Sequence, residues 1–166
     1  MPSTFFYFPT IATTSVVPNT PPRLPQVFPE YDPPLYFVTF NVRHRARLLA
    51  DDRVHAAFVR FARTGGQHGI FVGRYVVMPD HVHLFVRLRP DVVLGQWIRL
   101  LKRSLSVQIQ RPSPHWQAGF FDHLIRHSES YAAKWDYVRN NPVRAGLVSC
   151  AEDWPFQGEI VPLEAE

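Results

Sequence analysis

Cysteine and long apolar runs are scarce in this sequence of 166 residues. The single cysteine, Cys150, excludes a disulfide within the chain, and nothing in the composition requires an oxidising compartment. No apolar run is long enough to cross a bilayer, and no basic patch precedes an apolar stretch at the N-terminus. The sequence therefore predicts neither a membrane segment nor a secretory signal.

Acidic residues are fewer than basic ones, 14 against 18, which gives a net charge of +4 and a pI of about 9.6. A small basic protein can bind nucleic acid electrostatically, although many basic proteins bind nothing anionic. The charge therefore permits a nucleic-acid partner without identifying one. The length suffices for one domain with a proper core.

Charged residues are also few in the first 34 positions, where only Arg23, Glu30 and Asp32 carry charge. Nine of the 16 prolines lie in this segment. Because proline has no backbone donor, such a sequence resists packing into helices and strands. We predict a disordered proline-rich tail over residues 1–34, a folded domain over residues 35–156 and a C-terminal tail over residues 157–166.

Hydrophobic periodicity after the tail predicts four strands and three helices. Strands are expected at residues 35–42, 70–78 and 81–88 and within 115–126. Helices are expected from a cap at Asp51 to residue 64, from Asp91 to about residue 110, and from a cap at Ser128 to residue 140 or 141. The order β-α-β-β-α-β with a closing helix predicts an α+β fold, a ferredoxin-like antiparallel sheet with helices packed on one face.

Two histidines stand two positions apart on the third predicted strand. Side chains on a strand alternate faces, so His81 and His83 point the same way as Phe85, while the residues between them point into a core. Two imidazoles side by side on one face are well placed to share a divalent cation.

The closing helix has two faces. Its apolar residues recur at i, i+4 and i+7 and should pack on the sheet: Tyr131, Trp135 and Val138. Lys134, Tyr137 and Asn141 form a neighbouring polar face. If this helix approaches the histidine pair, an amide oxygen completes a ligand set and a phenol becomes a nucleophile beside it.

The residue types indicate phosphoryl chemistry. A phenol ionises with a pKa of about 10, so it is a weak nucleophile at neutral pH unless its oxyanion is stabilised. A metal ion can bind a phosphodiester oxygen, withdraw charge and orient the group for in-line attack. Two histidines and one amide oxygen leave room for substrate oxygens and water, which suits Mg²⁺ or Mn²⁺.

Three motifs carry a resemblance to a known family. The stretch Tyr75-Val76-Val77-Met78-Pro79-Asp80-His81-Val82-His83-Leu84 resembles the histidine-hydrophobe-histidine (HUH) motif of single-tyrosine transposases. Two further groups of residues resemble the REP-associated branch of these transposases, which are bacterial proteins linked to repetitive extragenic palindromes. The first group is Trp116-Gln117 together with residues 120–123 and 125–126, and the second is residues 136–148. The resemblance spans about residues 35–156, with the motifs in the correct order.

The resemblance implies an HUH nuclease fold, a divalent metal, and single-stranded DNA with a hairpin as substrate. The family's metal ligands match His81 and His83, and its nucleophile, which leaves a 5′-phosphotyrosine and a free 3′-hydroxyl, matches Tyr137. The polar residue one turn later, a ligand in relatives, matches Asn141. A transposase of this type is expected in the bacterial cytoplasm, at the nucleoid, as a monomer or a homodimer.

Several side chains are candidates for contact with DNA, either as cations for phosphates or as an aromatic surface for unpaired bases. They are scattered in the sequence, so they form one surface only if the fold gathers them around the histidines: Arg43, Arg45, Lys102, Arg103, Trp116, Arg126, Lys134 and Arg144.

Two other classes of function compete with a metal-dependent tyrosine endonuclease and strand transferase. One is a non-catalytic nucleic-acid-binding module on the same fold, kept as a host protein. The other is a metal-dependent hydrolase of small phosphoesters, which needs no basic groove. The intact Tyr137 and histidine pair favour the endonuclease.

Overall fold

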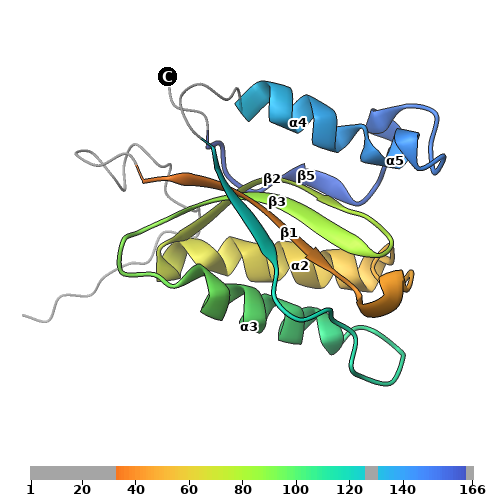
Figure 1. Cartoon of the computed structure of the whole chain (residues 1–166), viewed down its shortest axis with the longest axis horizontal. Helices are drawn as coiled ribbons and strands as arrows, with labels where there is room; N and C mark the ends of the chain where they lie inside the picture. The colour runs from red at the N-terminus through yellow and green to blue at the C-terminus, as the bar shows by residue number, and fades with distance from the viewer. Residues whose placement is uncertain (1–32, 126–130, 164–166) are drawn as a thin grey trace, which may run out of the picture.

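The alternating strands assemble into a five-stranded antiparallel sheet that lies between two layers of helices (Figure 1). The structure, a computed structural model, describes residues 33–125 and 131–163. Its strands are β1 (Leu35–Asn41), β2 (Ile70–Val77), β3 (His81–Leu88), β4 (Phe121–Ile125) and β5 (Gln157–Glu159). Its helices are α2 (Asp52–Thr64), α3 (Leu94–Ser106), α4 (Tyr131–Arg139) and α5 (Asn141–Arg144), with 3-10 turns η1 (Arg43–Arg45), η2 (Gly65–His68) and η3 (Ala151–Asp153). None of the described helices is long and apolar enough to span a membrane.

Strand β3 is the centre of the sheet, whose order is β4-β1-β3-β2-β5. The tight turn after β2 makes β2 and β3 an antiparallel hairpin, as the short connection predicts, and the Met78 amide donates to the His81 carbonyl over 2.8 Å. On its other side β3 pairs with β1, which places Thr39 opposite His83 and Asn41 opposite His81. The histidines therefore lie in the middle of the sheet, with a partner strand on each side.

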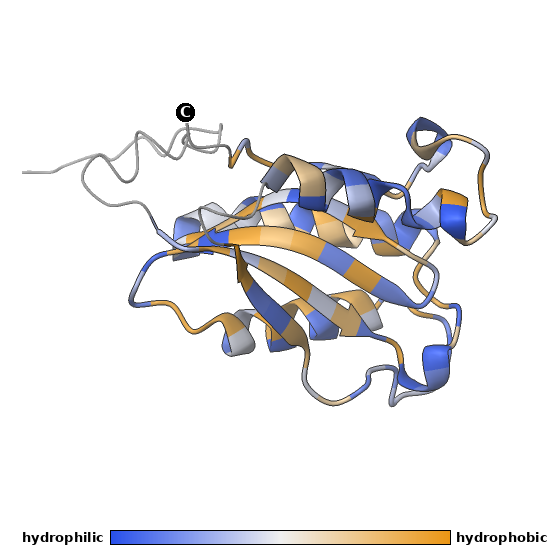
Figure 2. Ribbon diagram, turned by 45° about the horizontal axis from the view of Figure 1, so that its top comes forward, coloured by the Kyte–Doolittle hydropathy of each residue, from blue (hydrophilic) through white to orange (hydrophobic). Residues whose placement is uncertain are grey.

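One face of the sheet carries the larger core. Val82, Leu84 and Val86 of β3 are fully buried there against α2 and α3, which contribute Phe58 and Leu101. Figure 2 shows the strands coloured mostly as hydrophobic residues, and the helices as mixtures. The predicted fold class, with its ferredoxin-like order of elements, is confirmed.

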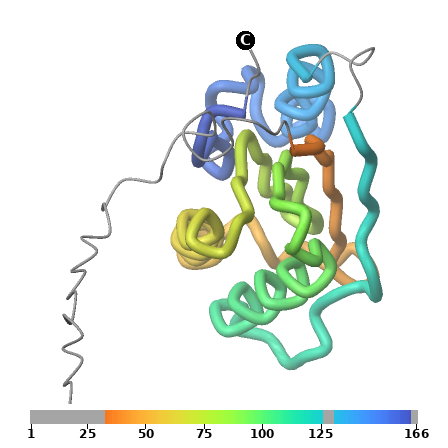
Figure 3. Tube along the Cα trace, turned by 90° about the vertical axis from the view of Figure 1, so that its left-hand side faces the viewer, coloured from red at the N-terminus to blue at the C-terminus, as the bar shows by residue number. Residues whose placement is uncertain are grey.

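The opposite face carries a second core under the closing helix α4. The ring of Phe85 lies 4.8 Å from that of Tyr131 and 6.5 Å from that of Trp135, and Val138 is buried. Figure 3 shows α4 on one side of the sheet and α2 and α3 on the other. Helices α2 and α3 thus share the face expected for helices, and α4 covers the face that carries the histidines because Phe85 makes that face apolar as well.

Helix α3 is shorter than expected. It begins at Leu94 without a side-chain cap, and its predicted opener, Asp91, binds the Arg89 guanidinium over 3.0 and 3.2 Å instead. The carboxylate is therefore engaged before the helix starts. The predicted cap at Ser128 and the first 32 residues of the predicted proline-rich tail lie outside the described residues.

The fold continues beyond residue 156, where the C-terminal tail was expected to begin. Strand β5 pairs with β2, and Val161 and Leu163 are buried in the second core. Leu163 packs on the backbone of β2 at Gly73, where any side chain would meet its methyl group at 2.5 Å. Residues 157–163 therefore belong to the folded unit, because their few apolar side chains cover an edge of the sheet that is otherwise exposed.

This close packing predicts a stability cost for shortening Leu163. Leu163→Ala should lower the free energy of unfolding by about 2–4 kcal/mol, because the side chain is 1% exposed and its removal leaves a cavity. Leu100→Ala, on the exposed side of α3, should cost less than about 1 kcal/mol. Urea denaturation of both variants measures the difference, and equal costs would show that the C-terminal segment does not pack as described.

Candidate functional site

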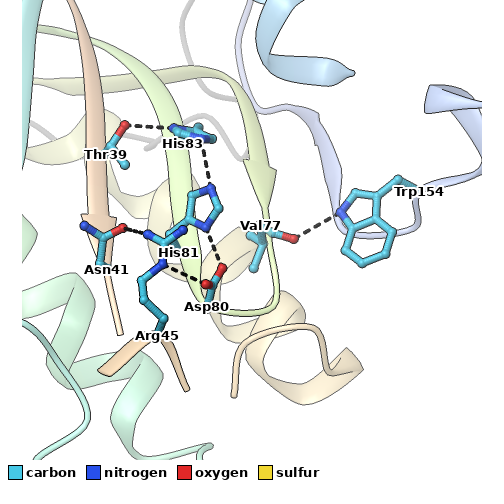
Figure 4. A network of polar contacts seen from close by, with 8 residues as sticks. All are labelled: Thr39, Asn41, Arg45, Val77, Asp80, His81, His83 and Trp154. Atoms are coloured by element: carbon cyan, nitrogen blue, oxygen red, sulfur yellow. Dashed lines mark hydrogen bonds and ion pairs between the residues drawn. The ribbon is translucent and has the colours of Figure 1, made fainter. Parts of the chain in front are cut away.

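The side chains of His81 and His83 lie next to each other on β3, as the alternation of the strand predicts. Their ring centroids are 4.6 Å apart, with the ring planes nearly perpendicular. Their Nε2 atoms face each other at 3.0 Å (Figure 4). Two ring nitrogens therefore meet at one point on the face that α4 covers.

The other nitrogen of each ring is held by a neighbour. The Nδ1 atom of His81 lies 2.6 Å from a carboxylate oxygen of Asp80, and that of His83 lies 2.8 Å from the hydroxyl of Thr39 (Figure 4). Because a carboxylate only accepts, His81 donates from Nδ1 and its neutral ring keeps an electron pair at Nε2. Thr39 can accept from Nδ1 of His83 and so give the second ring the same tautomer.

The basic turn η1 holds Asp80 in the position in which it orients His81. The Arg45 guanidinium pairs with the second oxygen of Asp80 at 2.8 Å and donates to the amide oxygen of Asn41 over 2.7 Å. His44 and Arg45 both have a backbone φ of 55°, a conformation that is unfavourable for residues other than glycine. The strained turn thus brings a predicted DNA-contacting arginine to the carboxylate that orients His81.

Burial keeps both rings neutral. It is the main cause that lowers the pKa of His83 to about 3, and the neighbouring His81 ring and the guanidinium groups of Arg45 and Arg144 act in the same direction. Burial also lowers the pKa of His81, against the opposing effect of the Asp80 carboxylate. Neutral imidazoles with free electron pairs are the form in which histidine binds metal ions.

A cavity of about 420 Å³ opens in front of the histidines. Helices α4 and α5 supply its far wall, with Lys134, Tyr137, Asn141 and Arg144 among the lining residues. Tyr137 is 64% exposed, so its phenol is accessible at the cavity. The structure therefore brings together the two histidines and the whole predicted polar face of the closing helix.

Two cations flank this cavity. The Arg144 guanidinium lies 4.1 Å from the centre of the Tyr137 ring and donates to the side-chain oxygen of Asn141. Lys134 lies 5.2 Å from the centre of the Phe37 ring, which stacks on His83. Two positive side chains thus line the cavity that contains the phenol, where an anionic group would approach it.

The remaining predicted DNA contacts do not line this cavity. Lys102, Arg103 and Trp116 line a separate cavity beside α3, and Arg43 is exposed on η1. Arg126 lies outside the described residues. Within the described part of the chain, the predicted surface is therefore divided between the two cavities and the turn η1.

The sequence did not identify Asp80 and Thr39 as functional residues, although both orient the histidines. Asp80 lies directly before His81 in the sequence, and a carboxylate next to a candidate metal-binding histidine is itself a signal, because such histidines usually donate to one. Thr39 had no local signal, since its place opposite His83 depends on the pairing of β1 with β3.

Comparison with known proteins shows which proteins this chain is similar to. Residues 35–141 match the family described as "Transposase IS200 like". The chain is 28% identical over 123 residues to the REP-associated tyrosine transposase of Escherichia coli K12, with 73% of each chain covered. It is 27% identical over 146 residues to a Haemophilus influenzae protein provisionally assigned to the same group, covering 80% of this chain and 83% of the relative.

The fold is similar to that of a REP-associated tyrosine transposase solved in complex with a REP hairpin. The TM-score is 0.62 at 27% sequence identity, and the match covers 76% of this chain and 77% of the other. These matches confirm the resemblance that the motifs indicated.

The low pKa of His83 predicts that acid destabilises the metal-free protein. Between pH 6.5 and about 3 the unfolded chain binds a proton at His83 that the folded chain does not, so the free energy of unfolding falls as the pH falls. At pH 5 the loss from this residue is up to about 2 kcal/mol relative to pH 7. His83→Gln should remove that part of the pH dependence, and the exposed His68→Gln should not.

Denaturation at pH 7 and pH 5, with a chelator present, measures the effect. If wild type and His83→Gln lose the same stability between the two pH values, the ring is not held neutral by burial.

Proposed function

Since this chain belongs to the IS200-like transposase family, whose match covers residues 35–141, we propose that it is a metal-dependent endonuclease and strand transferase of single-stranded DNA. Tyr137 is the nucleophile, and the cut lies at or near a DNA hairpin. The observation that carries the proposal is an accessible phenol at a cavity floored by two neutral histidines. A hairpin substrate is supported by the similar transposase that was solved with a REP hairpin.

Tyr137 is distinguished from the other described tyrosines by its surroundings. Tyr75 is buried, its hydroxyl lies 2.9 Å from Nε2 of His55, and burial raises its pKa to about 12. Tyr131 packs edge-on against Phe85 in the second core. Tyr137 alone among the tyrosines of the described segments lines the cavity that contains the histidines.

The residues present suit a divalent cation such as Mg²⁺ or Mn²⁺. Two imidazoles that direct their electron pairs to one point would hold such an ion and leave its other positions for oxygen ligands. The observed separation of the Nε2 atoms of His81 and His83 is 3.0 Å. Among the described residues no group of three or more His, Cys, Asp or Glu side chains could hold a metal ion by itself, so Asn141, water and phosphate oxygens would supply the other positions.

When bound, such an ion supplies neutralisation of phosphate charge and orientation of the group. The side-chain oxygen of Asn141 accepts from Arg144 and has a second electron pair to offer as a ligand. The residues of the chain that hold the ion are then His81, His83 and Asn141, with Asp80 and Thr39 fixing the ring tautomers.

The reaction is an exchange of phosphoester bonds. The Tyr137 oxygen bonds to the scissile phosphorus while the bond to the 3′-oxygen breaks, which leaves a 5′-phosphotyrosine ester and a free 3′-hydroxyl. The proton lost by the phenol balances the one gained by the 3′-oxygen. Arg144, which lies over the Tyr137 ring, and Lys134, which lines the same cavity, neutralise charge on the phosphate and on the forming phenolate.

Removing the phenol oxygen tests the nucleophile. Tyr137→Phe should abolish the covalent protein–DNA adduct and leave hairpin binding within about twofold, because the ring and its contact with Arg144 remain. Tyr36→Phe is the matched control and should form the adduct normally. The readout is a denaturation-resistant band formed with labelled single-stranded hairpin DNA and Mn²⁺. An adduct on Tyr137→Phe would remove this residue from the role, and binding without any adduct from wild type would favour a non-catalytic DNA-binding module.

Metal binding tests the histidine site without any use of activity. His81→Ala and His83→Ala should each abolish Mn²⁺ binding measured by calorimetry, and Asp80→Asn should weaken it about 10- to 100-fold by loosening the orientation of His81. His68→Ala, an exposed histidine on η2, should bind Mn²⁺ as wild type does. Unchanged Mn²⁺ affinity in both histidine variants would place the metal site elsewhere.

A further inference from the structure

A second cavity, of about 850 Å³, lies between α3 and the segment that leads into β4. On the helix side Arg99, Arg103 and Val107 line it, one helical turn apart, and on the other side Trp116 and Phe120 do. It shares no lining residue with the cavity in front of the histidines. The proposed cleavage reaction does not use it.

The charge of this cavity is of one sign. No acidic residue occurs between Asp91 and Asp122, and all four Arg and Lys residues of that stretch line the cavity: Arg99, Lys102, Arg103 and Arg111. The three arginines are exposed and form no ion pair with another described residue. A surface of this kind is complementary to an anion with several charges.

The walls of the cavity are fixed by internal hydrogen bonds. Lys102 donates to the carbonyls of Gln117 and Gly119 over 3.2 and 2.5 Å, and the ring nitrogen of Trp116 donates to the Lys102 carbonyl and the Ser106 hydroxyl over 3.0 and 2.7 Å. Burial lowers the pKa of Lys102, as expected for a cation that acts inside the fold. Lys102 and Trp116 therefore have a structural role here, and the three exposed arginines of the cavity are the side chains that remain available to bind a ligand.

A smaller hollow of about 270 Å³ adjoins this cavity on the side of β1 and β4. It shares residues 117–120 with the larger cavity, and its other lining residues are Asn41 and Phe121. Asn41 pairs with His81 in the sheet and accepts a hydrogen bond from Arg45, which binds Asp80. Phe121 is 59% exposed, so a large apolar side chain is open to solvent at this hollow.

We propose that the hollow and the large cavity together bind the unpaired strand that flanks the hairpin, as it leaves the cleavage site. The bases lie against Phe121 and the apolar wall near Phe120, and Arg99, Arg103 and Arg111 contact the phosphates at the rim. An aromatic surface exposed beside a row of unpaired arginines suits a single strand, since every base has a face to stack and every linkage a charge. This assignment rests on the proposed function for the nature of the ligand.

The test compares two DNA hairpins that differ only in an unpaired flank, bound by the full chain without metal. The double variant Arg99→Ala/Arg103→Ala should weaken binding of the flanked hairpin about tenfold or more, and of the hairpin without a flank less than about twofold. For the flanked hairpin, the slope of log affinity against log salt concentration should become shallower by about 1.4 in this variant, because two phosphate contacts on a single strand are lost. The control Arg60→Ala/Arg63→Ala removes two exposed arginines from α2 and should change neither affinity.

Stacking is tested separately with a fluorescent adenine analogue in the flank. Wild type should quench its emission, and Phe121→Ala should abolish the quenching with folding intact, since this side chain is exposed. If the arginine variant loses equal affinity for both hairpins, the arginines attract DNA without recognising the flank, and the proposal is overturned. So would an unchanged affinity for the flanked hairpin, or quenching that survives in Phe121→Ala.

Failure of the strand-binding proposal can be distinguished from failure of the proposed reaction. Adduct formation depends on Tyr137, whereas flank-dependent binding is measured without cleavage. A covalent adduct with no effect of the arginine variant would leave the reaction standing and remove the strand-binding role. Flank-dependent binding with no adduct would do the opposite.

Discussion

The packing of α4 on Phe85 is the interaction on which the site depends. Phe85 follows the two histidines on the same face of β3. One strand therefore fixes both the Phe85 ring, on which the helix packs, and the histidine rings, which line the cavity. With Tyr131, Trp135 and Val138 packed toward the sheet, helical geometry leaves Tyr137 at the cavity, with Asn141 just beyond the end of the helix. A phenol and two imidazoles that are more than 50 residues apart in sequence thus meet without a long loop between them.

Burial and positive charge act on the histidines in the same direction. Both keep the rings neutral, which suits metal binding, and both cost stability in acid. Asp80 opposes this effect for His81 and is itself held by Arg45 in a left-handed turn. The network in Figure 4 therefore fixes the orientation of the rings without protonating them.

Local periodicity in the sequence was enough to predict much of the fold and the faces on which the candidate site residues lie. Strand alternation placed His81 and His83 on one face, and helix periodicity separated the packing side of α4 from the side with Tyr137. The parts that were missed depend on contacts between distant segments. Thr39 reaches His83 only through the register of β1 with β3, and β5 is a short polar strand that becomes visible only through its pairing with β2.

The sequence also could not predict which basic residues act inside the fold and which remain available to a ligand. Lys102 resembles any surface lysine in a helix, yet the fold turns it inward to hold the carbonyls of Gln117 and Gly119. Arg45 is directed to Asp80 by a backbone conformation that its residue type does not favour. Charge counts predict that a basic surface exists, and only the packing decides which cations are left for a ligand.

Mass spectrometry of the protein after reaction with single-stranded hairpin DNA and Mn²⁺ tests the central claim most directly. Trypsin releases residues 135–139 as one peptide, in which Tyr137 is the only tyrosine. After nuclease digestion of the DNA, the account predicts a nucleotide mass attached to this peptide at the tyrosine. A nucleotide found on any other residue, or DNA cleaved with no nucleotide attached to the protein, would contradict it.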